Sequence, residues 1–71
     1  MTKSLDLHGT RHEDVDRLVE NFVLMNEAPV TIICGNSEEM AQLVRKVLDR
    51  IYDKHKISWH RWKYSEFKIL G

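Results

Sequence analysis

Two side chains near the N-terminus, Asp6 and His8, have the types and the spacing for acid–base chemistry. They lie in the stretch Leu5-Asp6-Leu7-His8-Gly9. In a β-strand, alternate side chains point to the same face, so the carboxylate and the imidazole would share one face and the leucines the other. The carboxylate could orient the imidazole, or the two groups could act as base and acid on a phosphodiester. The competing interpretation is a solvated strand face, with Gly9 permitting the sharp turn after it.

Two glycine loops, His8-Gly9-Thr10 and Cys34-Gly35-Asn36-Ser37, each follow an apolar run and precede a predicted helix. Neighbouring parallel strands would bring both loops to one edge of the sheet, where open α/β sheets bind ligands. Free N–H groups at two helix N-termini favour an anion such as a phosphodiester. The competing interpretation is that acidic residues already complement the helix dipoles and would repel phosphate; they are Glu13, Asp14, Glu38 and Glu39.

Aromatic and basic residues alternate near the C-terminus, in the run Trp59-His60-Arg61-Trp62-Lys63-Tyr64. This mixture suits stacking on unpaired bases with phosphate contacts beside them. Strand alternation cannot send both tryptophans to the same face, so we expect one in the core and Trp62 at least partly exposed.

The sequence gives little support for metal or thiol chemistry. His8 and His12 are four residues apart but straddle a loop and a helix start, and no carboxylate cluster accompanies them. A divalent metal cofactor stays possible without a visible ligand cluster. Cys34, the single cysteine, could form a dyad with His8, but a cysteine in Thr31-Ile32-Ile33-Cys34 is typical of a small buried apolar residue.

The chain of 71 residues has room for one domain, spanning 1–71. No apolar stretch approaches the length of a membrane span, and the first residues lack the apolar core of a signal peptide. A lone cysteine fits a reducing compartment, so we expect a cytoplasmic protein. The net charge of zero hides a division: residues 1–39 carry −5 and residues 40–71 carry +5. This division permits a basic patch, or two helices of opposite charge that attract each other.

Hydrophobic periodicity predicts helices over 11–26 and 38–54 and strands near 4–8, 30–34, 57–62 and 66–70. Thr10 and Glu13 have the spacing of a capping box, and Ser37 is the expected cap of the second helix. We expect a core that includes Val19, Phe22, Leu43, Val47 and Leu48. The last two strands form a hairpin, and right-handed crossovers make the first three strands parallel. The order is β-α-β-α-β-β, an α/β domain with both helices on one face of a mixed four-stranded sheet.

The motif Leu5-Asp6-Leu7-His8-Gly9, opening a β-α-β unit and followed by a β-branched strand that ends in glycine, resembles the Smr (small MutS-related) domain. The resemblance covers nearly the whole chain. It implies a two-layer fold similar to the C-terminal domain of translation initiation factor three. It also implies nucleic-acid binding, since many members of that family nick DNA or cleave RNA, with Asp6 and His8 at the reaction centre.

The second motif of that family, Thr or His followed by Gly, any residue and Gly, is Cys34-Gly35-Asn36-Ser37 here, so its second glycine is missing. Lys68, with Ser58 or His60, is expected on the same sheet face as Asp6 and His8. Together the loops and the basic half of the chain give the predicted binding residues: Gly9, Arg11, Gly35, Asn36, Ser37, Arg45, Arg61, Lys63 and Lys68.

Three functions remain open from the sequence. The first is an Smr-like endonuclease that binds DNA or RNA and cuts its phosphodiesters. The second is an inactive Smr-like module that binds structured nucleic acid or a protein partner. The third is a protein-interaction domain that buries its open sheet face.

Overall fold

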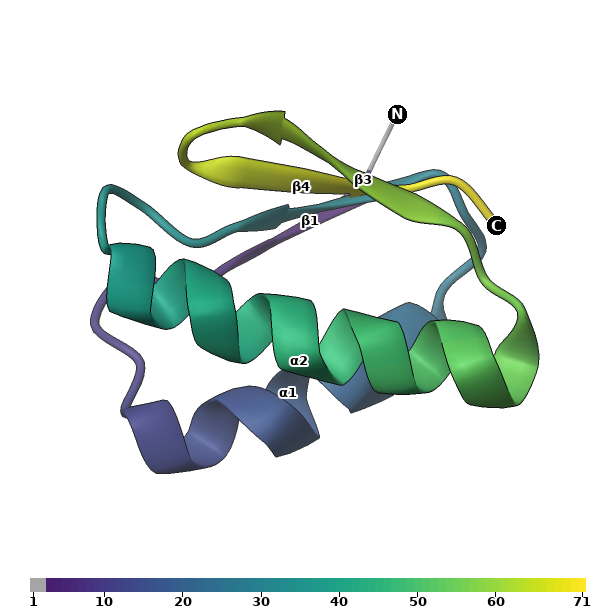
Figure 1. Cartoon of the computed structure of the whole chain (residues 1–71), viewed down its shortest axis with the longest axis horizontal. Coiled ribbons are helices and arrows are strands. Elements are labelled where there is room, and N and C mark those ends of the chain that lie inside the picture. The colour runs from purple at the N-terminus through teal and green to yellow at the C-terminus, as the bar shows by residue number, and fades with distance from the viewer. Residues whose placement is uncertain (1–2) are drawn as a thin grey trace.

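The computed structural model describes residues 3–71 and has two helices packed on one face of a four-stranded sheet, with the other face open (Figure 1). This arrangement confirms the predicted α/β fold and its element order. The elements are β1 (Lys3–Asp6), α1 (His12–Met25), β2 (Val30–Ile33), α2 (Glu38–His55), β3 (Trp59–Lys63) and β4 (Glu66–Ile69). No helix within residues 3–71 is long and apolar enough to cross a membrane.

The strands lie in the order β1-β2-β4-β3. β1 and β2 are parallel, while β4 is antiparallel to both β2 and β3, so β1, β2 and β3 run in the same direction. The last strand therefore occupies the interior of the sheet, and β3 becomes an edge strand although it comes earlier in the chain.

The core lies between the sheet and the helices. From the sheet side it contains Leu7, Val30, Ile32, Phe67 and Ile69, each about 1% exposed or less. Of the five core residues predicted from the sequence, Val19, Val47 and Leu48 are buried, whereas Phe22 and Leu43 are partly buried at the rim. Trp59 also packs against this core, while Trp62 is 52% exposed, which confirms that the two tryptophans lie on opposite faces.

The start of α1 differs from the prediction. Its N-cap residue is Arg11, and no side chain caps the helix. Thr10 instead belongs to the preceding turn, because its N–H donates to the carbonyl of Leu7 (2.9 Å) and Gly9 takes a φ of +76°. The predicted cap of α2 is confirmed, since Ser37 Oγ accepts from the N–H of Met40 at 3.1 Å.

All four strands differ from their predicted spans by one or two residues at an end, β1 and β3 most. β1 ends at Asp6, so His8 lies in a turn and strand alternation does not set its direction, although the N–H of Leu7 still bonds to the carbonyl of Ile33. β3 begins at Trp59 and carries an irregularity between Arg61 and Lys63. An inserted residue of this kind is a β-bulge, which increases the local twist of an edge strand.

The two helices are joined by ion pairs across their interface. Arg50 of α2 donates to Asp16 of α1 through Nη1 (3.0 Å) and Nη2, and its Nη2 lies 3.4 Å from Glu20. His12 and Glu39 lie 3.1 Å apart where the two helices begin. Some charges of the acidic and basic halves of the sequence are therefore paired inside the domain, where they join α1 to α2.

Candidate functional site

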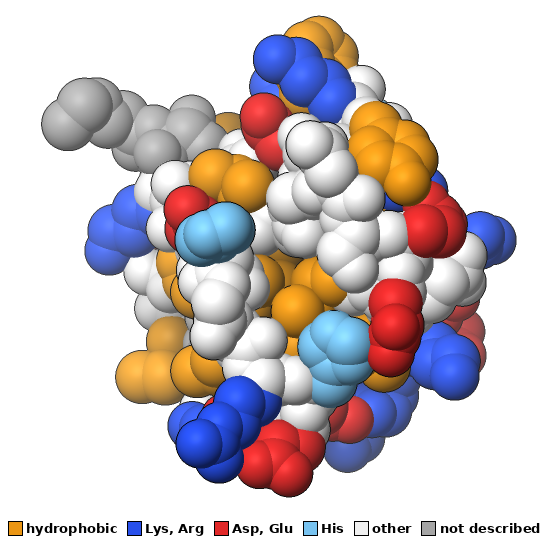
Figure 2. All heavy atoms as spheres, turned by 90° about the vertical axis from the view of Figure 1, so that its left-hand side faces the viewer, with side chains coloured by type: hydrophobic (Ala, Val, Ile, Leu, Met, Phe, Trp, Pro, Cys, Tyr) orange, Lys and Arg blue, Asp and Glu red, His pale blue; other side chains and the backbone are white. Residues whose placement is uncertain are grey.

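Three connections meet at one end of the molecule: the loop after β1, the loop after β2 and the turn between β3 and β4 (Figure 1). The N–H of Cys34 donates to the carbonyl of Ser65 at 2.8 Å, which ties the second loop to the turn. Figure 2 looks onto this end, where histidine, acidic and basic side chains surround a small exposed patch of hydrophobic surface. We call this region the loop end; it contains the parts of the predicted site that come from residues 6–12 and 34–39.

Asp6 and His8 are both exposed at the loop end, and a hydrogen bond joins them. The donor is the backbone N–H of His8 and the acceptor is Asp6 Oδ1, at 2.9 Å. The carboxylate therefore closes the turn after β1, an arrangement in which an Asp side chain replaces a backbone acceptor. The imidazole of His8 takes no part in this bond and stays accessible to solvent.

The two glycine loops have the backbone that glycine favours. Gly9 and Gly35 have φ values of +76° and +72°, and a Cβ at either position would meet no atom within 4 Å. The turn conformation explains both glycines, because side chains rarely adopt such φ values. Asn36 is exposed beside Gly35, and the hydroxyl of Ser37 is engaged as the helix cap.

Several cations near the loop end already face carboxylates. Arg11 lies 3.7 Å from Glu13, and Arg61 lies 3.2 Å from Glu38. The hydrogen bond from Arg61, followed by one from Gln42, holds the pKa of Glu38 below its usual range. An anion at the two helix N-termini would have to compete with these acids, which makes the loop end a weak phosphate site.

On the open face of the sheet, Asp6 and Lys68 were expected to lie together but are apart. Strand register places Lys68 in a row with Ser4, Thr31 and His60, and Asp6 in the next row with Ile33 and Glu66. Asp6 and Lys68 are two strand spacings apart, which is about 10 Å across the sheet alone. Ser58 lies outside the strands, just before β3. The structure thus brings Lys68 to His60 but does not bring either to Asp6.

Aromatic and cationic side chains gather instead on the β3–β4 hairpin. The ammonium of Lys68 lies 4.2 Å from the centroid of the Trp62 ring, and the rings of His60 and Trp62 are 6.3 Å apart. Trp62 and Tyr64 are 52% and 56% exposed. We call this group the hairpin surface; it consists of His60, Trp62, Lys63, Tyr64 and Lys68.

The predicted binding cations differ in their partners. Arg11 and Arg61 are in ion pairs, as described above. Arg45, Lys63 and Lys68 have no carboxylate within 4.0 Å among residues 3–71. Glu66 lies across from Lys63 in the strand register without forming an ion pair with it. The positive charge available to an outside partner is therefore concentrated on the hairpin and on α2.

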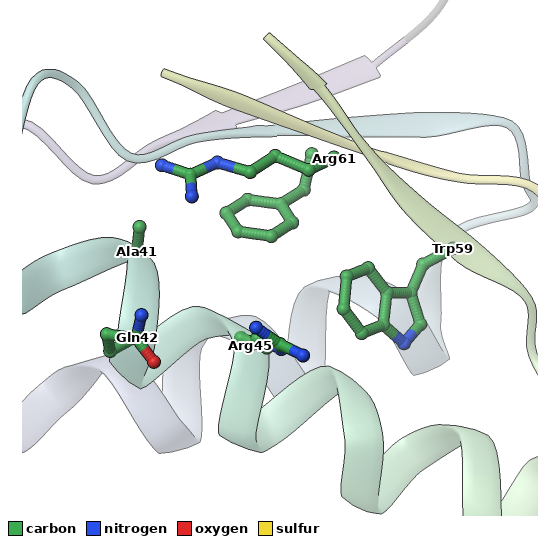
Figure 3. A pocket seen from close by; sticks show the side chains of 6 residues that line it. Ala41, Gln42, Arg45, Trp59 and Arg61 are labelled. Atoms are coloured by element: carbon green, nitrogen blue, oxygen red, sulfur yellow. The ribbon is translucent and has the colours of Figure 1, made fainter. Parts of the chain in front are cut away.

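The sequence did not predict a pocket on the helix side of the sheet (Figure 3). It lies between α2 and the hairpin and is lined by Ala41, Gln42, Arg45, Trp59, Arg61 and Phe67. Side-chain alternation along β3 could have indicated this pocket, because alternation places Trp59 and Arg61 on the face of the sheet that carries the helices. Arg45 follows Ala41 by one helical turn, which adds a cation at the same level.

Neither a group of metal ligands nor an activated thiol is found among residues 3–71. Among residues 3–71, no three His, Cys, Asp or Glu side chains are grouped so that they could hold a metal ion. Cys34 is a buried free thiol whose Sγ lies 3.6 Å from the carbonyl oxygen of Gly35, and burial raises its pKa. A raised pKa lowers the thiolate fraction and with it the nucleophilicity of the sulfur.

Comparisons with known proteins add no relative to this description: no family model matches the sequence, and neither a curated protein nor a solved structure matches it significantly. The resemblance to the Smr domain stays a prediction that depends on Leu5-Asp6-Leu7-His8-Gly9 and on the element order.

Proposed function

We propose that this chain binds unpaired nucleic acid on the hairpin surface. The observation that carries the proposal is the exposed ring of Trp62, with the ammonium of Lys68 4.2 Å from its centroid, on a hairpin whose lysines have no carboxylate partner in the described part of the chain. The second exposed ring, Tyr64, has the guanidinium of Arg61 5.0 Å from its centroid. Exposed aromatic rings stack on bases of any sequence, and neighbouring cations bind the phosphates between them. Both parts are present within one short hairpin.

Single strands suit this surface better than a duplex. Stacking on Trp62 requires a base that is free of its own stack, as in loops, ends and single strands. The Smr resemblance supports a nucleic-acid partner of either sugar type, and a cytoplasmic location would supply both RNA and the reducing conditions that keep Cys34 a thiol.

The test is the affinity for a fluorescent single-stranded oligonucleotide, measured by anisotropy for RNA, for DNA and for a duplex of the same sequence. Trp62→Ala should weaken binding of the single strands by about tenfold, since a stacked base contributes about 1–3 kcal/mol.

Tyr52→Ala is the matched control. Tyr52 is 47% exposed and has the ammonium of Lys56 5.7 Å from its ring centroid, but it lies on α2. Its removal should leave the affinity unchanged. Equal losses in the two variants, or no binding by the wild type, would reject the hairpin surface as the binding site.

Cleavage of the bound strand at the loop end is the second candidate activity. The observation that favours it is that the imidazole of His8 is exposed in a turn whose shape the carboxylate of Asp6 maintains. In RNA, His8 would accept the proton of the 2′-hydroxyl as its oxygen bonds to phosphorus. The bond from phosphorus to the 5′-oxygen would break and water would protonate that leaving oxygen, which gives a 2′,3′-cyclic phosphate and a free 5′-hydroxyl. Asp6 would hold the turn and offer its second oxygen, Oδ2, to a water or hydroxyl. Without cleavage, the chain is a binding module on the same hairpin surface.

A further inference from the structure

The pocket behind β3 has a mixture of walls that suits a flat polar ligand (Figure 3). Trp59 and Phe67 form its aromatic part, with ring centroids 5.7 Å apart and planes tilted by 56°. The guanidinium of Arg61 lies 5.5 Å from the Phe67 centroid. Bonds to Glu38 (3.2 Å) and to the carbonyl of Tyr64 (2.7 Å) fix its position. This wall is therefore ordered before any ligand arrives.

Other groups around the pocket are left to bind a ligand. Arg45 has no carboxylate within 4.0 Å among residues 3–71, so its guanidinium is available to bind an anion. Gln42 donates through Nε2 to Glu38 at 3.0 Å, which leaves its amide oxygen as an acceptor. The indole N–H of Trp59 is a donor without a hydrogen-bond partner in the described structure. A donor, an acceptor and a free cation thus accompany the aromatic walls.

The size of the pocket limits what can enter it. Its volume is about 210 Å³. Pockets for drug-sized ligands run from about 300 to 1,000 Å³. There is room for one heterocycle but not for a larger ring system. A single base offers a flat ring, donors and acceptors, and its phosphate offers the anion that Arg45 can bind.

We propose that this pocket receives one nucleobase, with the adjoining phosphate bound by Arg45. The inference depends on the proposed function in one respect, that the base belongs to the strand held on the hairpin surface. β3 makes this geometry possible because it is an edge strand with Trp62 on the open face and Trp59 on the helix face. A strand that crosses this edge can stack one base on Trp62 and turn another into the pocket.

The experiment uses Trp59 as the reporter. The chain has two tryptophans, so in a Trp62→Phe background Trp59 is the sole source of tryptophan fluorescence. Adenosine 5′-monophosphate, adenosine and inorganic phosphate are titrated separately. The nucleotide should change the emission saturably and bind at least about tenfold more tightly than either fragment, because only the nucleotide engages the aromatic walls and Arg45 together.

Three substitutions in this background locate the site. Arg45→Gln should weaken nucleotide binding by about tenfold, as expected for the loss of a hydrogen bond to a charged group. Lys46→Gln, an exposed neighbour on α2 that does not line the pocket, should leave it unchanged. Ala41→Leu places a larger side chain in the pocket and should abolish nucleotide binding. A melting curve shows whether this variant folds. If it does not fold, the result for Arg45→Gln decides whether the nucleotide binds in the pocket.

The outcomes separate this inference from the proposed function. An oligonucleotide that binds while the mononucleotide leaves Trp59 unchanged would overturn the pocket assignment alone. Equal weakening by Lys46→Gln, or equal affinity for inorganic phosphate, would also overturn it. A saturable response to the mononucleotide without binding of any oligonucleotide would support the pocket and reject the hairpin surface.

Discussion

At the scale of single residues, Asp6 has a structural role and a candidate chemical role, and the structure shows the first. Its carboxylate accepts the N–H of His8 at the end of β1, where the chain must leave the sheet. Leu7 fills the core, Gly9 supplies the positive φ and His8 contributes its backbone N–H, so the fold uses every part of Asp6-Leu7-His8-Gly9 except the His8 side chain. The exposed imidazole is the part of the motif that folding does not explain.

Substitutions at Asp6 separate these roles. Asp6→Ala removes the acceptor and should lower the free energy of unfolding by about 0.5–1 kcal/mol, measured by urea denaturation. Asp6→Asn keeps an oxygen at the same place and should unfold at nearly the wild-type urea concentration. If the carboxylate also serves cleavage, Asp6→Asn and His8→Ala should both stop the cutting of labelled RNA while strand binding persists. Cutting at the wild-type rate by both variants would contradict that role.

At the scale of secondary-structure elements, apolar periodicity was sufficient to predict both helices within one residue at each end. The ends of strands were harder, because the details there depend on hydrogen bonds between distant segments. Thr10 was predicted to cap α1, but its N–H is used by the turn that Gly9 and Leu7 form. The bulge in β3 depends on the pairing with β4, and a sequence pattern of period two cannot reveal it.

The predicted core can be tested on α2. Leu48 is 1% exposed in the centre of that helix, and Leu48→Ala should lower the free energy of unfolding by about 2–5 kcal/mol, because a cavity replaces the lost methyl groups. Leu24→Ala on α1 is the control, since Leu24 is 44% exposed and should cost less than about 0.5 kcal/mol. Urea denaturation of both variants measures the difference, and similar losses would contradict this core.

The contact between the helices should depend on pH. Hydrogen bonding to Arg50 lowers the pKa of Asp16 from its usual 3.8. The folded state therefore favours the carboxylate, and the stabilisation is present above that usual value and is lost as the pH falls through the lowered one. Asp16→Asn should cost about 0.5 kcal/mol at pH 7, because the pair is exposed to water. The difference from the wild type should shrink in urea denaturation at more acid pH; a constant difference would contradict the ion pair.

At the scale of the whole molecule, the sequence showed that charge is divided along the chain, but not which cations pair with carboxylates in the fold. Arg50 and Arg61 from the basic half pair with acids of the other half, which holds elements together. Arg45, Lys63 and Lys68 remain without a carboxylate partner within residues 3–71. Sequence counting cannot separate these two groups, because the pairing depends on which helices and strands become neighbours. The pocket was missed for the same reason, since its walls come from three elements.

The measurement that tests nucleic-acid binding by the hairpin surface most directly is the salt dependence of oligonucleotide affinity in wild type, Lys68→Gln and Lys54→Gln. The logarithm of the association constant should fall linearly with the logarithm of salt concentration, with a slope of about −0.7 for each phosphate neutralised on a single strand. Lys68→Gln should make that slope shallower by about 0.7, whereas Lys54→Gln, on the last turn of α2, should leave it unchanged. An association constant that does not change with salt concentration, or equal slopes in the two variants, would contradict nucleic-acid binding by the hairpin surface.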